Sequence, residues 1–239
     1  MSTLSDTLRR MASLVWPRRC AVCGGELPAG ADTICTMCRY TAPLTGYWRM
    51  EDNPLAQRLD ALAGVGRAAA LIFFSGGGWR ESIHGFKYGG LWRSARTLGR
   101  WLGAEMKSSG LYDDIDLVVP VPLHYRKQLR RGYNQSTYLA EGIARELGVA
   151  VDGRALRRSR NNPSQARRMH SERWEGVGGL FEVRRKERLA GRSILLVDDV
   201  FTTGATMTAC IEAVRRAVPD CRISAAVLAV SRKGLGIDQ

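Results

Sequence analysis

Residues 194–207 of this 239-residue chain read I-L-L-V-D-D-V-F-T-T-G-A-T-M, and the rest of the fold can be built outward from them. The first four, Ile194–Val197, are apolar and β-favouring, as in a parallel strand that is buried on both faces. Asp198 and Asp199 stand where such a strand would end, and open parallel sheets bind their ligands at the strand ends. The sequence therefore predicts an α/β protein with a ligand site at this position.

A turn of small residues follows the two acids and leads into a helix. Apolar residues recur at helical spacing from Met207 to Val218, and Pro219 ends the run. Unpaired backbone N–H groups and the helix dipole make such a helix start a natural phosphate site. Ionised carboxylates only accept hydrogen bonds, so the acid pair suits sugar hydroxyls. The alternatives are Mg²⁺ ligands, or an aspartate-capped turn that binds nothing.

This arrangement resembles the phosphoribosyl pyrophosphate (PRPP) binding motif of type I phosphoribosyltransferases, whose fold is a twisted parallel sheet flanked by helices. The resemblance implies that Asp198 and Asp199 bind the ribose 2′ and 3′ hydroxyls. It also implies that the 5′-phosphate is bound by the turn, which consists of Thr202, Thr203, Gly204, Ala205 and Thr206. In this family Mg²⁺ accompanies PRPP and is held mostly by the sugar and the pyrophosphate.

The charge of the chain indicates an acidic partner. The net charge is +13 and the sequence pI is about 10.0, which favours phosphates, nucleic acid or an anionic surface as partners. Residues 124–173 hold 12 Lys/Arg against 4 Asp/Glu, although a solvated basic surface would have the same composition. No apolar run approaches the ~20 residues of a membrane span, and no signal-peptide core is present, so we expect a cytoplasmic protein.

Four of the six cysteines form two closely spaced pairs near the N-terminus, Cys20-x-x-Cys23 and Cys35-x-x-Cys38, with 11 residues between them. In a reducing compartment this spacing predicts a structural Zn²⁺ site with four thiolate ligands. Four reduced cysteines without a metal are the alternative. We therefore expect an N-terminal helix at 1–17, a zinc ribbon at 18–45, a connector at 46–66 and the phosphoribosyltransferase-like domain at 67–239.

Further strands and helices are indicated along the main domain. Strands are expected at 68–74, 115–119 and 223–230, and helices at 91–107 and from Asn134 to Leu147. The glycine run Ser75–Gly78 is expected to form a hairpin turn, because no clear helix start follows it.

Three basic segments are candidates for ligand contacts. A proline-bounded loop, which could include a cis bond, is expected to bind pyrophosphate through its cations and donors: His124, Arg126, Lys127, Arg130 and Arg131. Phe86, Lys87 and Tyr88 could contact a base or nucleic acid, although core packing of the two rings explains them equally well. Residues 157–173 are typical of a mobile lid, with Gln165 and Arg168 as contacts, or of a disordered basic loop.

Taken in order, the motifs narrow the resemblance to one branch. The paired cysteines, His84–Gly90, Val119–His124, Arg131–Gln135 and the PRPP motif together resemble the ComF family of competence proteins. The match runs from Cys20 to Val230 and covers nearly the whole chain, although Gly176 stands where the family commonly has Asn. The resemblance implies a role in natural competence, with single-stranded DNA and the DNA-uptake helicase or other competence proteins as partners.

Two functional hypotheses follow from these motifs. In the first, PRPP bound with Mg²⁺ loses pyrophosphate to a nucleophile, as in a phosphoribosyltransferase of nucleotide metabolism or salvage. In the second, the pocket only retains its ligand, while the ribbon and the basic region bind single-stranded DNA. The sequence identifies neither the acceptor nor any catalytic residue.

Overall fold

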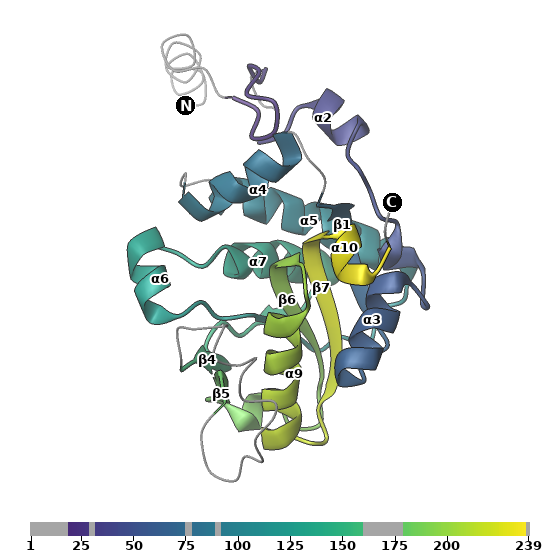
Figure 1. The fold of residues 1–239 in the computed structure, drawn as a ribbon, viewed down its shortest axis with the longest axis vertical. Helices are drawn as coiled ribbons and strands as arrows, with labels where there is room; N and C mark the ends of the chain where they lie inside the picture. Colours follow the sequence, from purple (N-terminus) through teal and green to yellow (C-terminus); the bar gives the residue numbers. More distant parts are fainter. Residues whose placement is uncertain (1–18, 29–31, 75–77, 89–91, 160–178, 238–239) are drawn as a thin grey trace, which may run out of the picture.

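A five-stranded, all-parallel sheet forms the centre of the molecule (Figure 1). The computed structural model describes residues 19–28, 32–74, 78–88, 92–159 and 179–237, so the helix expected at 1–17 lies outside the described residues. The strand order is β1-β7-β6-β2-β3. The strands are β1 (Ala68–Phe73), β2 (Leu117–Pro120), β3 (Ala150–Val151), β6 (Ser193–Phe201) and β7 (Arg222–Val230). The α/β class predicted from the sequence is confirmed.

Helices cover both faces of this sheet and make a three-layer structure (Figure 1). One face carries α5 and α7, and the other carries α3 and α9. The helices are α2 (Thr36–Tyr40), η1 (Tyr47–Arg49), α3 (Pro54–Ala63), α4 (Gly78–Tyr88), α5 (Trp92–Ser109), α6 (Tyr125–Arg131), α7 (Gln135–Leu147), η3 (Lys186–Arg188), α9 (Ala205–Ala217) and α10 (Arg232–Leu235). A separate antiparallel pair consists of β4 (Leu156–Arg158) and β5 (Phe181–Val183).

The central strand β6 is buried on both faces, as its apolar run predicts. Ile194 and Leu196 pack on the side of α3 and α9, whereas Leu195 and Val197 pack on the side of α5 and α7. All four side chains are fully buried. Alternate residues of a strand point to opposite faces, so a continuous apolar run serves two cores at once.

Helices α5 and α7 pack against each other backbone to backbone. A Cβ atom on Gly103 would lie 2.8 Å from the Cα of Ile143, and one on Gly142 would lie 2.6 Å from the backbone nitrogen of Arg100. The distance between two packed helices depends on the side chains at their contact. Glycine has no side chain, so α5 and α7 can approach closely here. The close contact determines where the first turn of α7 lies relative to the sheet.

The hairpin expected at Ser75–Gly78 is wrong. Strand β1 pairs in parallel with β7, which lies far along the chain, and α4 begins at Gly78. Trp79 and Ile83 of this helix are buried. Gly78 approaches the backbone carbonyl of Val22 so closely that any side chain would collide with it. The glycine therefore allows α4 to begin against the N-terminal segment. The need for glycine comes from a residue that is distant in the sequence.

The proline-bounded loop is shorter than expected, because residues 125–131 form the helix α6. His124 caps this helix by accepting a hydrogen bond at Nδ1 from the backbone N–H of Arg126, at 3.3 Å. Gly132 ends it with a left-handed φ of 78°. No cis peptide bond occurs in the described part of the chain, the proline segment included.

The segment expected to connect the ribbon to the main domain, 46–66, contains η1 and α3. Leu55 and Leu59 of α3 are fully buried in the core that lies under α9. Asn53 caps α3 with its carboxamide oxygen and donates its Nδ2 to the carbonyl of Ala68 in β1, at 2.8 Å. The domain boundary drawn at this segment stays a prediction.

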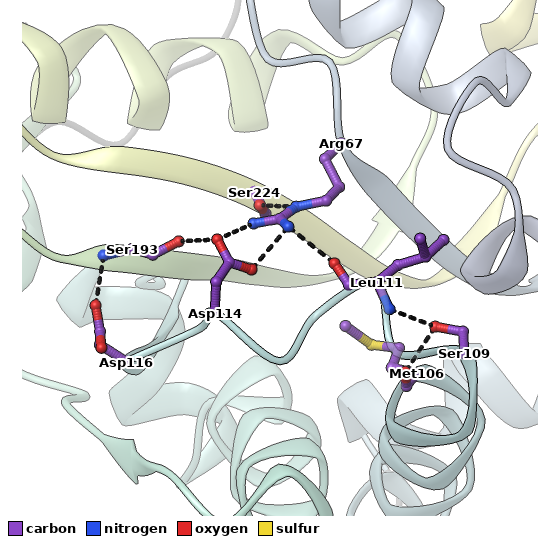
Figure 2. Close-up of polar contacts among 8 residues, drawn as sticks. All are labelled: Arg67, Met106, Ser109, Leu111, Asp114, Asp116, Ser193 and Ser224. Carbon is purple, nitrogen blue, oxygen red and sulfur yellow. Dashed lines mark hydrogen bonds and ion pairs between the residues drawn. The ribbon is translucent and has the colours of Figure 1, made fainter.

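A polar network joins the amino ends of the strands, at the opposite end of the sheet from Asp198 (Figure 2). Arg67 donates to Ser224 Oγ, to the carbonyl of Leu111 and to Asp114, each at 2.8 Å. Asp114 also accepts from the hydroxyl of Ser193, at 3.0 Å. One guanidinium thus ties β1, β7 and the segment that enters β2. The contact with Arg67 lowers the pKa of the Asp114 carboxyl.

We expect Arg67→Ala to lower the free energy of unfolding by about 1–2 kcal/mol, since charge-assisted hydrogen bonds are lost from a partly exposed site. Urea unfolding monitored by circular dichroism measures this, with Arg58→Ala, at an exposed position of α3, as the control. The Asp114 pKa is lowered in the folded state, so the stabilisation is present at neutral pH and is lost as the pH falls through that pKa. Equal unfolding curves for the two variants would contradict this role of Arg67.

Candidate functional site

Asp198 and Asp199 lie where β6 has lost one of its two neighbouring strands. Strand β2 pairs with β6 only as far as Val197, whereas β7 continues to pair with β6 as far as Phe201. The strand therefore runs through the acids and ends four residues later than the apolar run alone predicts. One edge of β6 is open beside the carboxylates, which is the strand-end position predicted for a ligand site.

The first turn of α7 holds both carboxylates. Gln135 donates its Nε2 to Asp199 Oδ2 at 2.9 Å, and Ser136 donates its hydroxyl to Asp198 Oδ1 at 3.0 Å. Backbone N–H groups of Asp199 and Val200 also donate to these carboxylates, both at 2.9 Å. Gln135 and Ser136 are buried. These contacts orient the acid pair before any ligand binds.

Sequence reasoning missed these two holding contacts. The Arg131–Gln135 motif includes Gln135 but predicts no contact between it and the acids, and none of the sequence motifs includes Ser136. Asn134 places them: it caps α7 by accepting from the N–H of Ser136, and it donates Nδ2 to the carbonyl of Val121, at 3.0 Å. The helix start is thereby tied to the chain that leaves β2. The acids that Gln135 and Ser136 hold lie more than 60 positions away, so no local pattern reports these contacts.

The turn after β6 has the geometry of an anion site. Helix α9 begins at Ala205 with Gly204 as its N-cap, at φ 81°, and this glycine supplies no side-chain cap. The hydroxyl of Thr203 accepts from the N–H of Ala205 at the long distance of 3.5 Å. A small cavity of about 30 Å³ lies over this turn. A Cβ on Gly204 would lie 2.8 Å from both Leu62 Cδ1 and Phe201 Cζ. The first N–H groups of a helix and its dipole attract an anion at this position.

A larger cleft of about 360 Å³ adjoins the acids. Its lining comes from five parts of the chain and contains both polar and apolar residues. The polar residues are Arg131, Gln135, Arg158, Asp198, Asp199, Thr202 and Thr206, and the apolar residues are Phe74, Ile83, Val121, Pro122, Leu123 and Val200. A charged, hydroxylated ligand with one apolar part would match such a lining.

Arg158 is a cleft residue that sequence reasoning placed only within the basic loop. It ends β4, its guanidinium carbon lies 5.3 Å from the ring centre of Phe181, and it is only 9% exposed. Burial lowers the pKa of Arg158, while Cys210 and Asp198 act in the opposite direction. A guanidinium stays charged at neutral pH, so the cleft contains a buried cation beside its acid pair.

The residues expected to bind pyrophosphate do not all face the cleft. Arg131 lines it and donates Nη1 to Gln135 Oε1, at 3.3 Å. His124 is buried with its ring 4.6 Å from that of Tyr125, and Arg126 is exposed and donates to the Tyr125 hydroxyl. Lys127 and Arg130 lie on α6, but their side chains are not among those described. Pyrophosphate binding by these five residues stays a prediction.

Two other predicted groups can be located only in part. Phe86, Lys87 and Tyr88 belong to α4, whose Ile83 lines the cleft, but their side chains are outside the described set. Gln165 and Arg168 fall within 160–178, which lies outside the described residues. Their roles stay predictions.

The four N-terminal cysteines come together as the spacing predicts. All four sulfurs of Cys20, Cys23, Cys35 and Cys38 lie within 4.8 Å of one another, and those of Cys23 and Cys35 are 3.9 Å apart. Tetrahedral Zn–S bonds of about 2.3 Å would place sulfurs about 3.8 Å apart. The thiol set therefore fits a tetrahedral thiolate-bound metal ion such as Zn²⁺.

Backbone donors prepare this cluster for a cation. The N–H groups of Val22 and Cys35 point at the Cys20 sulfur, at 3.5 and 3.3 Å. Burial alone would raise the pKa of Cys20, but backbone donors outweigh it and lower that pKa to about 6. Burial and the neighbouring sulfurs raise the pKa of Cys38. A bound metal cation would favour the thiolate form of both cysteines, because metal binding displaces the thiol protons.

Comparisons with known proteins agree with this geometry. A model of the phosphoribosyl transferase domain family matches residues 134–238, which include α7, β6 and α9. A solved adenine phosphoribosyltransferase from Saccharomyces cerevisiae aligns at 18% identity with a TM-score of 0.36, covering 64% of this chain and 78% of that one. The family match and the helix-flanked parallel sheet identify a phosphoribosyltransferase fold.

Relatives with curated names narrow this class. The chain is 25% identical over 206 residues to competence protein F of Haemophilus influenzae, covering 79% of this chain and 87% of that protein. It is 27% identical to the DNA utilization protein YhgH of Escherichia coli O157:H7, covering 81% and 89%. Competence protein ComFC of Bacillus subtilis is 34% identical over 100 residues, covering 41% and 38%. The chain is a homologue of these proteins, which are named for competence and DNA utilization, and the resemblance to ComF proteins is confirmed.

Gly204→Ala is expected to destabilise the protein by about 2 kcal/mol and to weaken phosphate binding, because it adds a steric conflict to left-handed backbone strain. Gly148→Ala is the matched control, since Gly148 has φ 77° and nothing within 4 Å of a Cβ. The control should lose only about 1 kcal/mol. Urea unfolding and calorimetric titration with inorganic phosphate measure both effects. Equal losses would show that Leu62 and Phe201 do not constrain the turn.

Cys23→Ser is expected to abolish tight Zn²⁺ binding, because a structural zinc site needs all four ligands. The wild type should hold about one Zn²⁺ per chain, measured by plasma mass spectrometry after dialysis, and should lose thermal stability on chelation. Cys221→Ser serves as the control, since Cys221 lies outside the cluster. Full zinc content in Cys23→Ser would refute the assignment.

Proposed function

We propose that this protein binds PRPP or a related phosphoribosyl ligand in the cleft beside Asp198 and Asp199, and that it acts in natural competence and DNA uptake. The observation that carries the proposal is the pair of carboxylates, held by Gln135 and Ser136, next to the N-terminus of α9. The acids suit vicinal hydroxyls and the helix start suits a phosphate. Both groups occur at these relative positions in a phosphoribosyl ligand.

The other cleft residues complete this arrangement. The turn formed by Thr202, Thr203, Gly204, Ala205 and Thr206 would surround the 5′-phosphate. Arg131 and Arg158 supply two cations for the pyrophosphate, which a guanidinium can contact through two parallel hydrogen bonds. Mg²⁺ would be held mostly by ligand oxygens and would neutralise the pyrophosphate, since few carboxylates line the cleft.

The role in competence draws on the relatives and on charge. Relatives named competence protein F, YhgH and ComFC support a role in handling incoming DNA. The net charge of +13 favours a polyanion. Within the described residues, no helix is long and apolar enough to cross a bilayer. The proposal places the protein in the cytoplasm, where it meets single-stranded DNA and the DNA-uptake helicase or other competence proteins.

A second candidate function is transfer of the phosphoribosyl group in nucleotide metabolism or salvage. The apolar lining residues of the cleft, among them Phe74, Ile83 and Val121, favour it because a planar acceptor could pack against them. The acceptor nitrogen would bond to the ribose carbon as the bond to pyrophosphate breaks. Arg131 and Arg158 would stabilise the charge on the departing pyrophosphate.

Calorimetric titration with PRPP and Mg²⁺ tests the ligand. Asp198→Asn combined with Asp199→Asn should weaken binding at least tenfold, since each hydrogen bond to a charged group contributes about 1.5–3 kcal/mol. Asp60→Asn is the matched control, because Asp60 is exposed on α3 and outside the cleft. Unchanged affinity in the double variant would refute ribose binding by these acids.

A second measurement separates binding from transfer. Pyrophosphate release is followed with PRPP alone, with nucleobases and with single-stranded DNA. Tight PRPP binding without release under any condition favours the binding protein. Release that depends on a nucleobase, together with no affinity for single-stranded DNA, favours the salvage enzyme.

A further inference from the structure

A row of three aromatic rings lies at the junction of α5 and α7. Trp92 begins α5, Tyr138 lies in the first turn of α7, and Tyr133 precedes that helix. The ring centres of Trp92 and Tyr138 are 5.2 Å apart, and those of Tyr138 and Tyr133 are 5.8 Å apart. All three side chains are half-buried, so each ring keeps part of its surface in solvent. We call these three residues the aromatic row.

Two arginines of α5 accompany the row. The guanidinium of Arg93 lies 5.0 Å from the ring centre of Trp92, and that of Arg96 lies 5.3 Å from Trp92 and 5.2 Å from Tyr138. Arg93 is exposed, whereas Arg96 also forms an ion pair with Glu141 of α7. The row thus combines π surfaces with cations at its rim.

Helix packing alone does not require this group. Gly99 and Gly142 already bring α5 and α7 into backbone contact, and Leu98 and Leu139 are buried beneath them. Nucleic-acid stacking surfaces combine partly exposed aromatic rings with neighbouring cations. The half-buried rings and the arginines at this helix junction have the same composition. The ion pair with Glu141 explains Arg96, because it links α5 to α7. It does not explain why Arg93 lies on the ring of Trp92.

The position of the row links it to the ligand cleft. Tyr133 is followed directly by Asn134, Gln135 and Ser136, the residues that tie α7 to β2 and hold the acid pair. Arg131, two residues before Tyr133, lines the cleft. A strand of nucleic acid on the row would therefore lie beside the cleft.

We propose that the aromatic row is a binding site for single-stranded DNA, in which unpaired bases stack on Trp92, Tyr133 and Tyr138 while Arg93 and Arg96 contact phosphates. The proposal rests on the DNA-handling function proposed above and assigns that function a place on the surface. Bases in a duplex are already stacked on one another, so only unpaired bases can use such rings. Stacking tolerates any base, which suits a protein that handles DNA of arbitrary sequence.

Fluorescence anisotropy with a labelled oligothymidine tests this on the full-length, zinc-loaded protein. Trp92→Leu should weaken binding about tenfold, within the range for loss of one stacking ring, whereas Trp92→Phe should retain most of the affinity. Trp101→Leu is the matched control, because Trp101 lies on the same helix and also pairs with an arginine, Arg39, outside the row. PRPP affinity of each variant, measured by calorimetry, verifies that the fold is intact.

Crosslinking of the wild-type protein supplies a test that needs no variant. Oligonucleotides with 5-bromodeoxyuridine form photo-crosslinks to nearby aromatic residues, and mass spectrometry should place them on Trp92, Tyr133 or Tyr138. Crosslinks confined to other segments, or equal affinity of Trp92→Leu and wild type, would overturn the aromatic row while leaving DNA handling intact. If the wild type does not bind single-stranded DNA at low salt, the proposed DNA handling fails together with the row.

Discussion

Two adjacent carboxylates at the open edge of β6 are the constraint on which the rest of the site depends. Asp198 and Asp199 carry carboxylates that only accept hydrogen bonds, so both need donors from neighbouring elements to fix their orientation. Gln135 and Ser136 supply donors from α7. They can do so only because α7 begins at the exit of β2, and the glycine contacts with α5 place the helix there. The hydrophobic core thus determines the geometry of the polar site.

Local features of the site were predictable from the sequence. The apolar strand, the acids, the turn at Thr202–Thr206 and the following helix are neighbours in the chain, so their residue types indicate their structure directly. Gln135, Ser136 and Arg158 reach the acids or the cleft from other elements, and no local pattern reports such contacts. The same reason explains the error at Gly78, where the glycine serves a distant neighbour, Val22, rather than a turn.

The cysteine segment is physically continuous with the cleft. Cys20, Ile34 and Cys38 share one buried cluster with Trp79 and Ile83 of α4, and Ile83 also lines the cleft. A metal that orders the cysteines would therefore stabilise the helix that forms one apolar wall of the ligand site. Sequence spacing predicted the cluster correctly, because cysteine pairs carry their own signature, whereas its packing against α4 depends on contacts between residues far apart in the chain.

The short segment from Arg131 to Ser136 is the point at which the two proposed ligands meet. Its first residue lines the cleft, Tyr133 belongs to the aromatic row, and its last two residues hold the acids. If DNA on the row changes the order of this segment, the affinity for PRPP changes with it, and linkage requires PRPP to change DNA affinity by the same factor. Such coupling does not require the phosphoribosyl group to be transferred. Under the proposed function, a phosphoribosyltransferase fold would serve DNA handling by sensing a nucleotide precursor, because the segment that holds the two acids also carries Tyr133 of the aromatic row.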